Sequence, residues 1–285
     1  MSLLILGSIV VGLFGGYFSG LFGIGGGMVM VPALLLLFHL DGLAPFLAWQ
    51  LAVGSTLLAS VVIDLVVARL YLRHQGVRWD LVPGFLLSIL LGLWVGISFS
   101  PLLEGTFIEI GLGFLMMAAG LRMVQELPAE ESGKDAITNS TGPDEESALP
   151  VDSLQRDGWR LSSLLGIGIG FLGGMSGIGG TILLVPTLIL ITGLPVQQSI
   201  ATTAVMSFFF SLAGATGLVD AGWHQEVLPF GSVGLILPGV IVALILGALV
   251  TAPWGWQRNN ALSHQHLMQG FGIVLLAGGV EVIWR

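Results

Sequence analysis

Residues whose spacing suggests chemistry are concentrated in a glycine-rich stretch that this chain contains twice. GLFGIGGGMVMVP at 20–32 recurs as GMSGIGGTILLVP at 174–186, an offset of 154 residues from Gly20 to Gly174. Glycine lowers helix stability by about 1 kcal/mol relative to alanine, so clustered glycines break a helix. An apolar helix that starts after such a break has free N–H groups and a positive dipole end, which favour anions. The repeated stretch therefore predicts backbone amides that bind a small anion.

Hydroxyl side chains follow each glycine stretch and complete the candidate binding set. A hydroxyl and a backbone N–H can hold an anion without a fixed positive charge, and no Lys or Arg lies centrally in any expected span. The alternative role of these hydroxyls is helix–helix hydrogen bonding. The predicted substrate-binding residues are Gly23, Gly25, Gly26, Gly27, Ser55, Thr56, Ser176, Gly177, Gly179, Gly180, Thr181, Thr202 and Thr203.

Two acidic residues lie within expected membrane spans, where charge is costly and usually functional. Asp64 is a candidate coupling residue, with pairing to Arg69 near the cytoplasmic surface as the alternative. Glu109 is a candidate proton carrier, with a place at the wet outer end of its span as the alternative. The identity of the coupling ion, a proton or another cation, stays open at this point.

Other chemistries have less support in the sequence. The chain has no cysteine, which excludes disulfides, iron–sulfur clusters and thiol catalysis. His264 and His266 lack a third ligand, and we expect neither a metal nor a cofactor. The stretch 174–177 matches the Gly-x-Ser-Gly of rhomboid intramembrane proteases, but that chemistry needs a histidine base. Because no expected span carries a central histidine, we do not expect an enzyme.

The elements that carry these residues have the composition of a membrane protein. The chain is 54% hydrophobic and 9% charged, whereas soluble domains have about 25% charged residues. Its apolar runs approach the roughly 20 residues that cross a bilayer core. We therefore expect an all-α, multi-span protein in an inner (plasma) membrane, whose N-terminal run is a first span rather than a signal peptide.

The apolar segments form two sets of five, each with a short second member of about 12 residues, roughly 18 Å of helix. An odd number of segments in each half requires two inverted repeats, each with a glycine-broken half-helix. The first set is 3–22, 27–38, 45–68, 81–100 and 105–124, and the second is 161–176, 181–192, 197–218, 227–250 and 267–284. Gly-x-x-x-Gly patterns at 12–20, 92–96 and 166–174 predict close helix packing rather than binding.

A polar linker at 125–159 separates a first repeat, 1–124, from a second repeat, 160–285. Nine of the 17 acidic residues lie between Glu126 and Asp157, so the net charge of −8 belongs to this loop and does not indicate nucleic-acid binding. Its composition predicts disorder. Basic residues predict that the linker, the loop after the third segment and loop 251–266 are cytoplasmic, with both termini outside.

The duplicated glycine-rich stretch resembles sequences of the sulfite exporter TauE/SafE family. The hydroxyl clusters AVGSTL at 52–57 and SIATTAV at 199–205 share this resemblance. The resemblance covers essentially the whole chain except the linker. It implies a secondary transporter, an exporter of sulfite or short organosulfonates that works by alternating access. The alternative is a transporter or channel for another small organic anion. The implied partners are the anion, the bilayer and the coupling ion, with a homodimer kept as a candidate.

Overall fold

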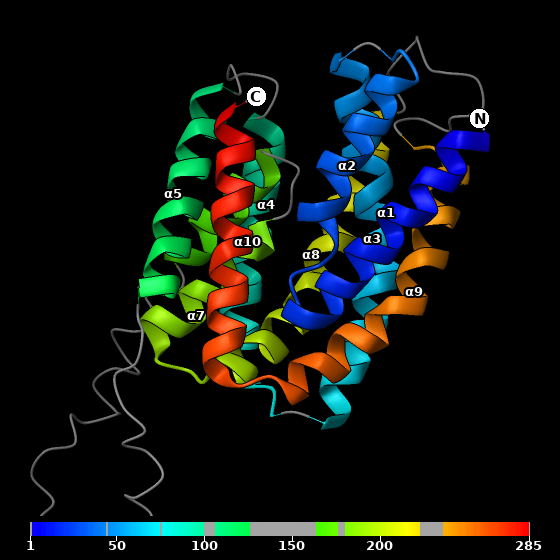
Figure 1. The fold of residues 1–285 in the computed structure, drawn as a ribbon. Coiled ribbons are helices and arrows are strands. Elements are labelled where there is room, and N and C mark those ends of the chain that lie inside the picture. The colour runs from blue at the N-terminus through cyan, green and yellow to red at the C-terminus, as the bar shows by residue number, and fades with distance from the viewer. Residues whose placement is uncertain are drawn as a thin grey trace, which may run out of the picture.

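The computed structural model describes residues 2–43, 45–74, 76–99, 106–125, 164–175, 180–222 and 236–284, and within these ranges the regular elements are helices (Figure 1). The helix Leu164–Met175 lies between α5 and the 3-10 helix η1. The remaining elements are α1 (Ser2–Phe22), α2 (Gly27–Leu40), α3 (Pro45–His74), α4 (Val82–Phe99), α5 (Thr106–Gln125), η1 (Gly180–Leu183), α7 (Leu184–Thr192), α8 (Val196–Gly222), α9 (Pro238–Ala261) and α10 (His264–Trp284).

Five helices of the described residues are long and apolar enough to cross a membrane: α1, α3, α4, α8 and α9. Many of their large apolar side chains are exposed, including Trp94 and Leu246. Lipid can cover such a surface, whereas water cannot, because the transfer of apolar area to water is unfavourable. The chain is a multi-pass, all-helical membrane protein.

Most helix bounds match the expected segments, but the bounds expected for the fourth segment of the second half are wrong. The apolar run predicted 227–250, whereas α9 spans Pro238–Ala261. Proline is favoured at the first positions of a helix, so Pro238 sets the start. The helix then continues through Pro253 and includes Arg258 in its last turn, although that residue was expected in a loop. The linker at 125–159 lies almost entirely outside the described residues.

Small residues allow two helix pairs to approach closely, as the Gly-x-x-x-Gly patterns predicted. A Cβ on Gly12, Gly16 or Gly20 of α1 would collide with the backbone of α9, at Leu244, Ala248 and Ala252 respectively. In the same way, Gly92 and Gly96 of α4 lie against the backbone of the helix Leu164–Met175. The packing role of these glycines is confirmed, since close backbone contact is what small residues provide between membrane helices.

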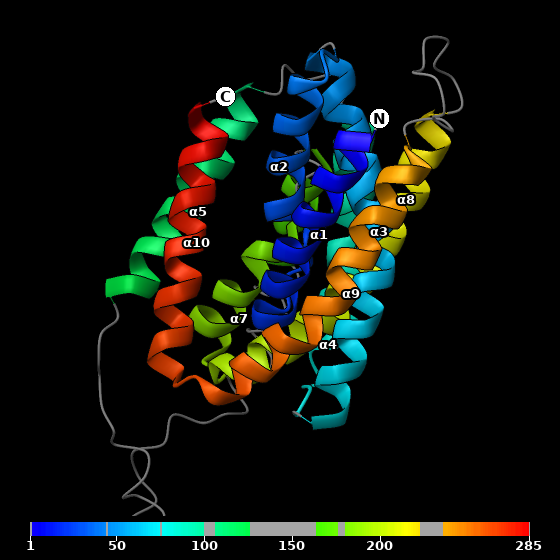
Figure 2. The same ribbon diagram turned by 45° about the vertical axis from the view of Figure 1, so that its right-hand side comes forward.

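The other main contacts join α3 to α8 and α5 to α10. Figures 1 and 2 show that α3 and α8 run in opposite directions, and that α5 and α10 form a pair along one side of the bundle. Both termini lie at one end of the bundle, and the connections α3–α4 and α9–α10 lie at the other (Figure 1). The two ends of α1 and α2 that face each other, near residues 22 and 27, lie inside the molecule.

Candidate functional site

The first glycine stretch interrupts a helix inside the protein. α1 ends at Phe22 and α2 begins at Gly27, and residues 21–26 between and beside them are buried. Gly23 and Gly25 have φ angles of 65° and 71°, which a side chain at these positions would disfavour. Non-helical backbone at membrane depth is tolerated only where protein or a water-filled cavity surrounds it. The break therefore needs polar partners from neighbouring elements.

Side chains from four surrounding elements supply hydrogen bonds to the carbonyl groups that the break frees. Each donor comes from a different element, namely α3, α9, α8 and η1, so four separate parts of the chain converge on this short stretch. The pairs are Tyr71 Oη with the Gly20 carbonyl at 2.7 Å, Asn259 Nδ2 with Leu21 at 2.7 Å, Ser207 Oγ with Gly23 at 3.2 Å and Thr181 Oγ1 with Ile24 at 2.9 Å.

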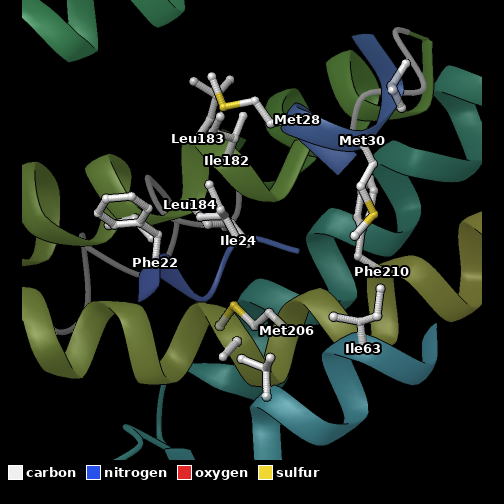
Figure 3. Close-up of a cluster of buried hydrophobic side chains, with 14 of the residues drawn as sticks. Phe22, Ile24, Met28, Met30, Ile63, Ile182, Leu183, Leu184, Met206 and Phe210 are labelled. Atoms are coloured by element: carbon white, nitrogen blue, oxygen red, sulfur yellow. The ribbon is translucent and has the colours of Figure 1, made fainter. Parts of the chain in front are cut away.

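Thr181 belongs to the second glycine stretch, so its bond to Ile24 brings the two repeated stretches into direct contact. Apolar side chains enclose the same region. Figure 3 shows side chains of the first stretch and of α2, of Ile182–Leu184 and of α8 within one cluster. The first glycine stretch and the described part of the second therefore lie side by side in the core.

The backbone N–H groups at the start of α2 are less well satisfied than the carbonyls. Met30 and Val29 donate to the Gly26 carbonyl, which begins the helix. The N–H groups of Gly25, Gly26 and Gly27 have no partner among the described residues. Three donors that have no partner among the described residues, together with the positive end of a helix dipole, suit a small negatively charged group.

Asp64 of α3 lies beside these donors. The residue is 1% exposed, and its Oδ2 forms a hydrogen bond with Ser211 Oγ of α8 at 2.5 Å. A Cβ built on Gly25 would lie 3.3 Å from both carboxyl oxygens, so the carboxyl group faces the break. Its Oδ1 has no partner among the described residues. Arg69 is exposed and forms no ion pair with Asp64 in the described part of the chain, so the alternative of pairing these two is wrong.

The hydroxyl clusters of the two halves do not converge on one point. Ser55 Oγ accepts a hydrogen bond from the Leu237 N–H at the start of α9, and Thr202 Oγ1 accepts one from the Arg78 N–H just before α4. These two helix starts lie at opposite ends of the bundle (Figure 1). A single small anion therefore cannot touch both clusters in this conformation.

The neighbouring threonines, Thr56 and Thr203, are buried, and their Oγ1 atoms have no partner among the described residues. Thr56 precedes Asp64 by eight residues, and Thr203 precedes Ser211 by eight. At 1.5 Å per residue each threonine lies about 12 Å along its helix from the Asp64–Ser211 contact. Figure 2 shows that α3 and α8 run in opposite directions. The two threonines therefore lie on opposite sides of the Asp64–Ser211 contact.

Several predicted site residues lie outside the described part of the structure. These are Ser176, Gly177 and Gly179 of the second glycine stretch, whereas Gly180 begins η1. Glu109 belongs to α5, but its side chain is outside the described residues. Their predicted roles stay predictions.

Sequence reasoning missed four residues that the structure places around the break: Tyr71, Ser207, Ser211 and Asn259. A usable signal existed for the two serines, because their four-residue spacing in an otherwise apolar run puts both on one helix face. Tyr71 and Asn259 had no such signal, since each lies near a helix end where polar residues are common.

These features define the class of the protein as a multi-pass helical membrane protein with a broken helix held at its centre. The chain belongs to the sulfite exporter TauE/SafE family, whose family model matches residues 8–282. No solved structure matches the chain with statistical significance.

Three curated relatives match this chain over most of their own length at low identity. A protein of Haemophilus influenzae named "Probable membrane transporter protein" is 25% identical over 99% of this chain and 98% of its own length. YunE of Bacillus subtilis, with the same description, is 26% identical over 100% of this chain and 98% of its own length. A probable membrane transporter protein of Methanocaldococcus jannaschii is 21% identical over 91% of this chain and 88% of its own length. The family and these names support a membrane transporter.

Proposed function

We propose that this chain is an inner-membrane secondary transporter that exports small sulfur-containing anions, such as sulfite or short organosulfonates, by alternating access. The observation that carries the proposal is the buried break between α1 and α2, whose N–H groups at Gly25, Gly26 and Gly27 have no partner among the described residues and would bind the anion. The carbonyl groups of the break are held by Tyr71, Asn259, Ser207 and Thr181. The donors are therefore left for a ligand that accepts hydrogen bonds.

Helix pairing supports an inverted relationship between the two halves. The first helix of each half pairs with the fourth helix of the other half, as α1 does with α9 and the helix Leu164–Met175 does with α4. The third helices α3 and α8 pair with each other, as do the fifth helices α5 and α10. A two-fold rotation about an axis in the membrane plane would leave these pairings unchanged, as in inverted-repeat transporters.

The chemistry of the buried core supports an oxyanion substrate that must also be released. The buried polar residues of the described part include serines, threonines, Asp64 and Asn259, but no Lys or Arg. Neutral donors hold a sulfite or sulfonate oxygen without a fixed counter-charge that would retain it. Because residues 21–26 are buried, a substrate reaches the break only after the surrounding helices move. We therefore infer that one repeat rocks against the other.

Proteoliposomes containing the purified protein test the proposal. Radiolabelled sulfite and a two-carbon sulfonate should exchange across the membrane with saturation, and carboxylates of the same size should compete weakly. Gly25→Val and Gly179→Val should abolish exchange while the protein still inserts and purifies as wild type. Normal exchange rates in both variants would show that the glycine breaks are not the binding site. A leak at channel rates that does not saturate would contradict the carrier mechanism.

A further inference from the structure

We propose that Asp64 is a proton-binding site whose occupancy decides whether the adjacent helix break accepts an anion, so that proton and anion cross the membrane together. This inference deepens the proposed function and rests on it. Two features of the break conflict with each other. The N–H groups of Gly25–Gly27, which have no partner in the part of the chain that the structure describes, favour a negative group, yet a carboxyl group of the protein already faces Gly25. Two negative groups at one helix start repel each other.

The hydrogen bonds around Ser211 show how a proton resolves the conflict. Ser211 Oγ lies 2.5 Å from Asp64 Oδ2 and 2.8 Å from the Ser207 carbonyl oxygen. A serine hydroxyl has one proton and so donates to only one of these acceptors. Both bonds form together only when Asp64 is protonated, because its O–H then donates to Ser211 Oγ while Ser211 donates to Ser207. Ionised Asp64 would instead accept the hydrogen bond from the Ser211 hydroxyl, and the Ser207 carbonyl would lose that hydroxyl as a donor.

This switch connects to the break through the same turn of α8. Ser207, whose carbonyl accepts from Ser211, donates its own hydroxyl to the Gly23 carbonyl at 3.2 Å. A change in the protonation of Asp64 therefore changes the hydrogen bonds of a residue that holds the break in place. Asp64 and Ser211 also occupy equivalent positions in the two halves, because Asp64 follows Thr56 by eight residues and Ser211 follows Thr203 by eight. A site at that position can be reached from either side when the halves rock.

No cation in the described residues balances the charge that Asp64 would carry when ionised. Of the elements packed against α3, α8 faces Asp64 with Ser211, α1 places Ser19 near the carboxyl group, and α2 adjoins it through the break that contains Gly25. None of the titratable side chains of these elements and of α3 pairs with Asp64 in the part of the chain that the structure describes. They are Tyr17 on α1, His39 on α2, Arg69, Tyr71 and Arg73 on α3, and Arg258 on α9.

Protonation of Asp64 therefore leaves the N–H groups at the start of α2 available to the substrate, whereas ionisation of Asp64 opposes substrate binding. Binding of one proton with one singly charged anion makes transport electrically neutral. Its direction then follows the sum of the pH gradient and the anion gradient. Net export requires an outward anion gradient larger than the opposing proton gradient, which accumulation of a toxic anion in the cell would supply.

Infrared spectroscopy of the purified protein tests the proton site without any substrate. A protonated carboxyl group absorbs at a C=O frequency separate from that of a carboxylate. We expect such a band in the wild type at mildly acidic pH, its loss on titration to alkaline pH, and its absence in Asp64→Asn. Ser211→Ala should shift the pH at which the band disappears, whereas Thr216→Ala, a hydroxyl change farther along α8, should not. Absence of any Asp64-dependent band from mildly acidic to alkaline pH would overturn the proposal.

Transport assays test the coupling. The probe is a radiolabelled two-carbon sulfonate, because its charge does not change over this pH range, whereas sulfite itself takes up a proton near neutrality. One pH unit across the membrane should change the equilibrium accumulation ratio about tenfold for one-proton coupling. Asp64→Asn should keep exchange at equal pH and lose gradient-driven accumulation. Asp80→Asn, an exposed acid outside the spans, serves as the matched control with normal coupling.

The possible outcomes separate this inference from the proposed function. Accumulation that follows a sodium gradient and ignores the pH gradient would overturn the inference and leave the transporter standing. Failure of the wild type to move any sulfur-containing anion would overturn the proposed function, while the infrared band still decides the proton site. If Asp64→Asn does not fold, the shift of the band in Ser211→Ala assigns the carboxyl group instead.

Discussion

Thr181 donates a hydrogen bond from its Oγ1 to the carbonyl of Ile24 at 2.9 Å, and so joins the second glycine stretch to the first across 157 positions of the chain. Thr181 is the residue of the second stretch that corresponds to Gly27 in the first. The bond therefore links the two repeated stretches asymmetrically, since Gly27 has no side chain to return it. It both satisfies a buried carbonyl and fixes the distance between the two helix starts.

Loss of the Thr181 hydroxyl should destabilise the protein and slow transport. Thr181→Val keeps the shape of the side chain but leaves the Ile24 carbonyl without its partner, which costs about 1 to 3 kcal/mol. Thr181→Ser keeps the hydroxyl and should lie close to the wild type. Thermal unfolding in detergent, followed with exchange assays, measures both effects. Equal behaviour of the valine and serine variants would show that the hydrogen bond has no role.

Gly25→Ala should impair transport more than its backbone strain explains. Gly25 has φ of 71°, and its added Cβ would lie 3.3 Å from both Asp64 carboxyl oxygens. Gly42 has φ of 80°, but a Cβ there meets no atom within 4 Å, so Gly42→Ala is a matched control for strain alone. Both variants should lose about 1 to 2 kcal/mol of stability, while only Gly25→Ala should lose exchange activity. Similar transport in the two would argue against a role for the space beside Asp64.

Tyr71→Phe should destabilise the folded structure around the helix break without changing the N–H groups of the break. The Tyr71 hydroxyl is the donor to the Gly20 carbonyl at 2.7 Å, and the ring itself is buried. Removal of the hydroxyl leaves a buried acceptor with one partner fewer, a loss of about 1 to 3 kcal/mol. Melting temperature should fall, while substrate affinity at low temperature stays near that of the wild type. A large change in affinity with unchanged stability would instead place Tyr71 in the binding site.

Gly16→Ala and Gly168→Ala should change stability in opposite directions. A Cβ on Gly16 would overlap the backbone of α9 at Ala248, so α1 and α9 must separate. A Cβ on Gly168 meets no atom within 4 Å, and alanine improves helix propensity there by up to about 1 kcal/mol. Unfolding midpoints of the two variants, measured side by side, provide the comparison. Stabilisation by Gly16→Ala would contradict the observed α1–α9 contact.

The ion pair of Arg78 with Asp80 should contribute little to the stability of the folded protein, and it should contribute only above acidic pH. Hydrogen bonds from Arg78 hold the pKa of the Asp80 carboxyl below its usual value. The two side chains are 45% and 51% exposed, so the pair is worth less than about 1 kcal/mol. A lowered folded-state pKa stabilises the protein above the usual aspartate pKa, and this stability disappears as the pH falls through the folded value. Asp80→Asn should lower the melting temperature slightly at neutral pH and leave it unchanged in strong acid. A large loss at neutral pH would contradict this assignment.

The sequence by itself determined the properties that depend on local composition. Apolar runs predicted the helices, because burial in lipid and helix formation are decided within about 20 neighbouring residues. The cluster at Gly23–Gly27 predicted the break, because consecutive glycines disfavour a helix wherever they occur. The repeat of that cluster and the absence of central basic residues also led to the prediction of a small-anion transporter, of which the family and its relatives support the membrane-transporter class.

Only the tertiary structure decided which polar groups meet. Asp64 and Ser211 are 147 positions apart, and nothing local to either residue names the other. The sequence left Asp64 either as a coupling residue or as the partner of Arg69, its nearest cation, whereas helix packing turns Asp64 inward toward α8 and the break. It also grouped the hydroxyls of both halves at one site, whereas opposite helix directions place Thr56 and Thr203 on either side of the Asp64–Ser211 contact. The physical reason is that partners across a helical bundle are chosen by the fit of whole surfaces, which close glycine contacts fix over the length of each helix.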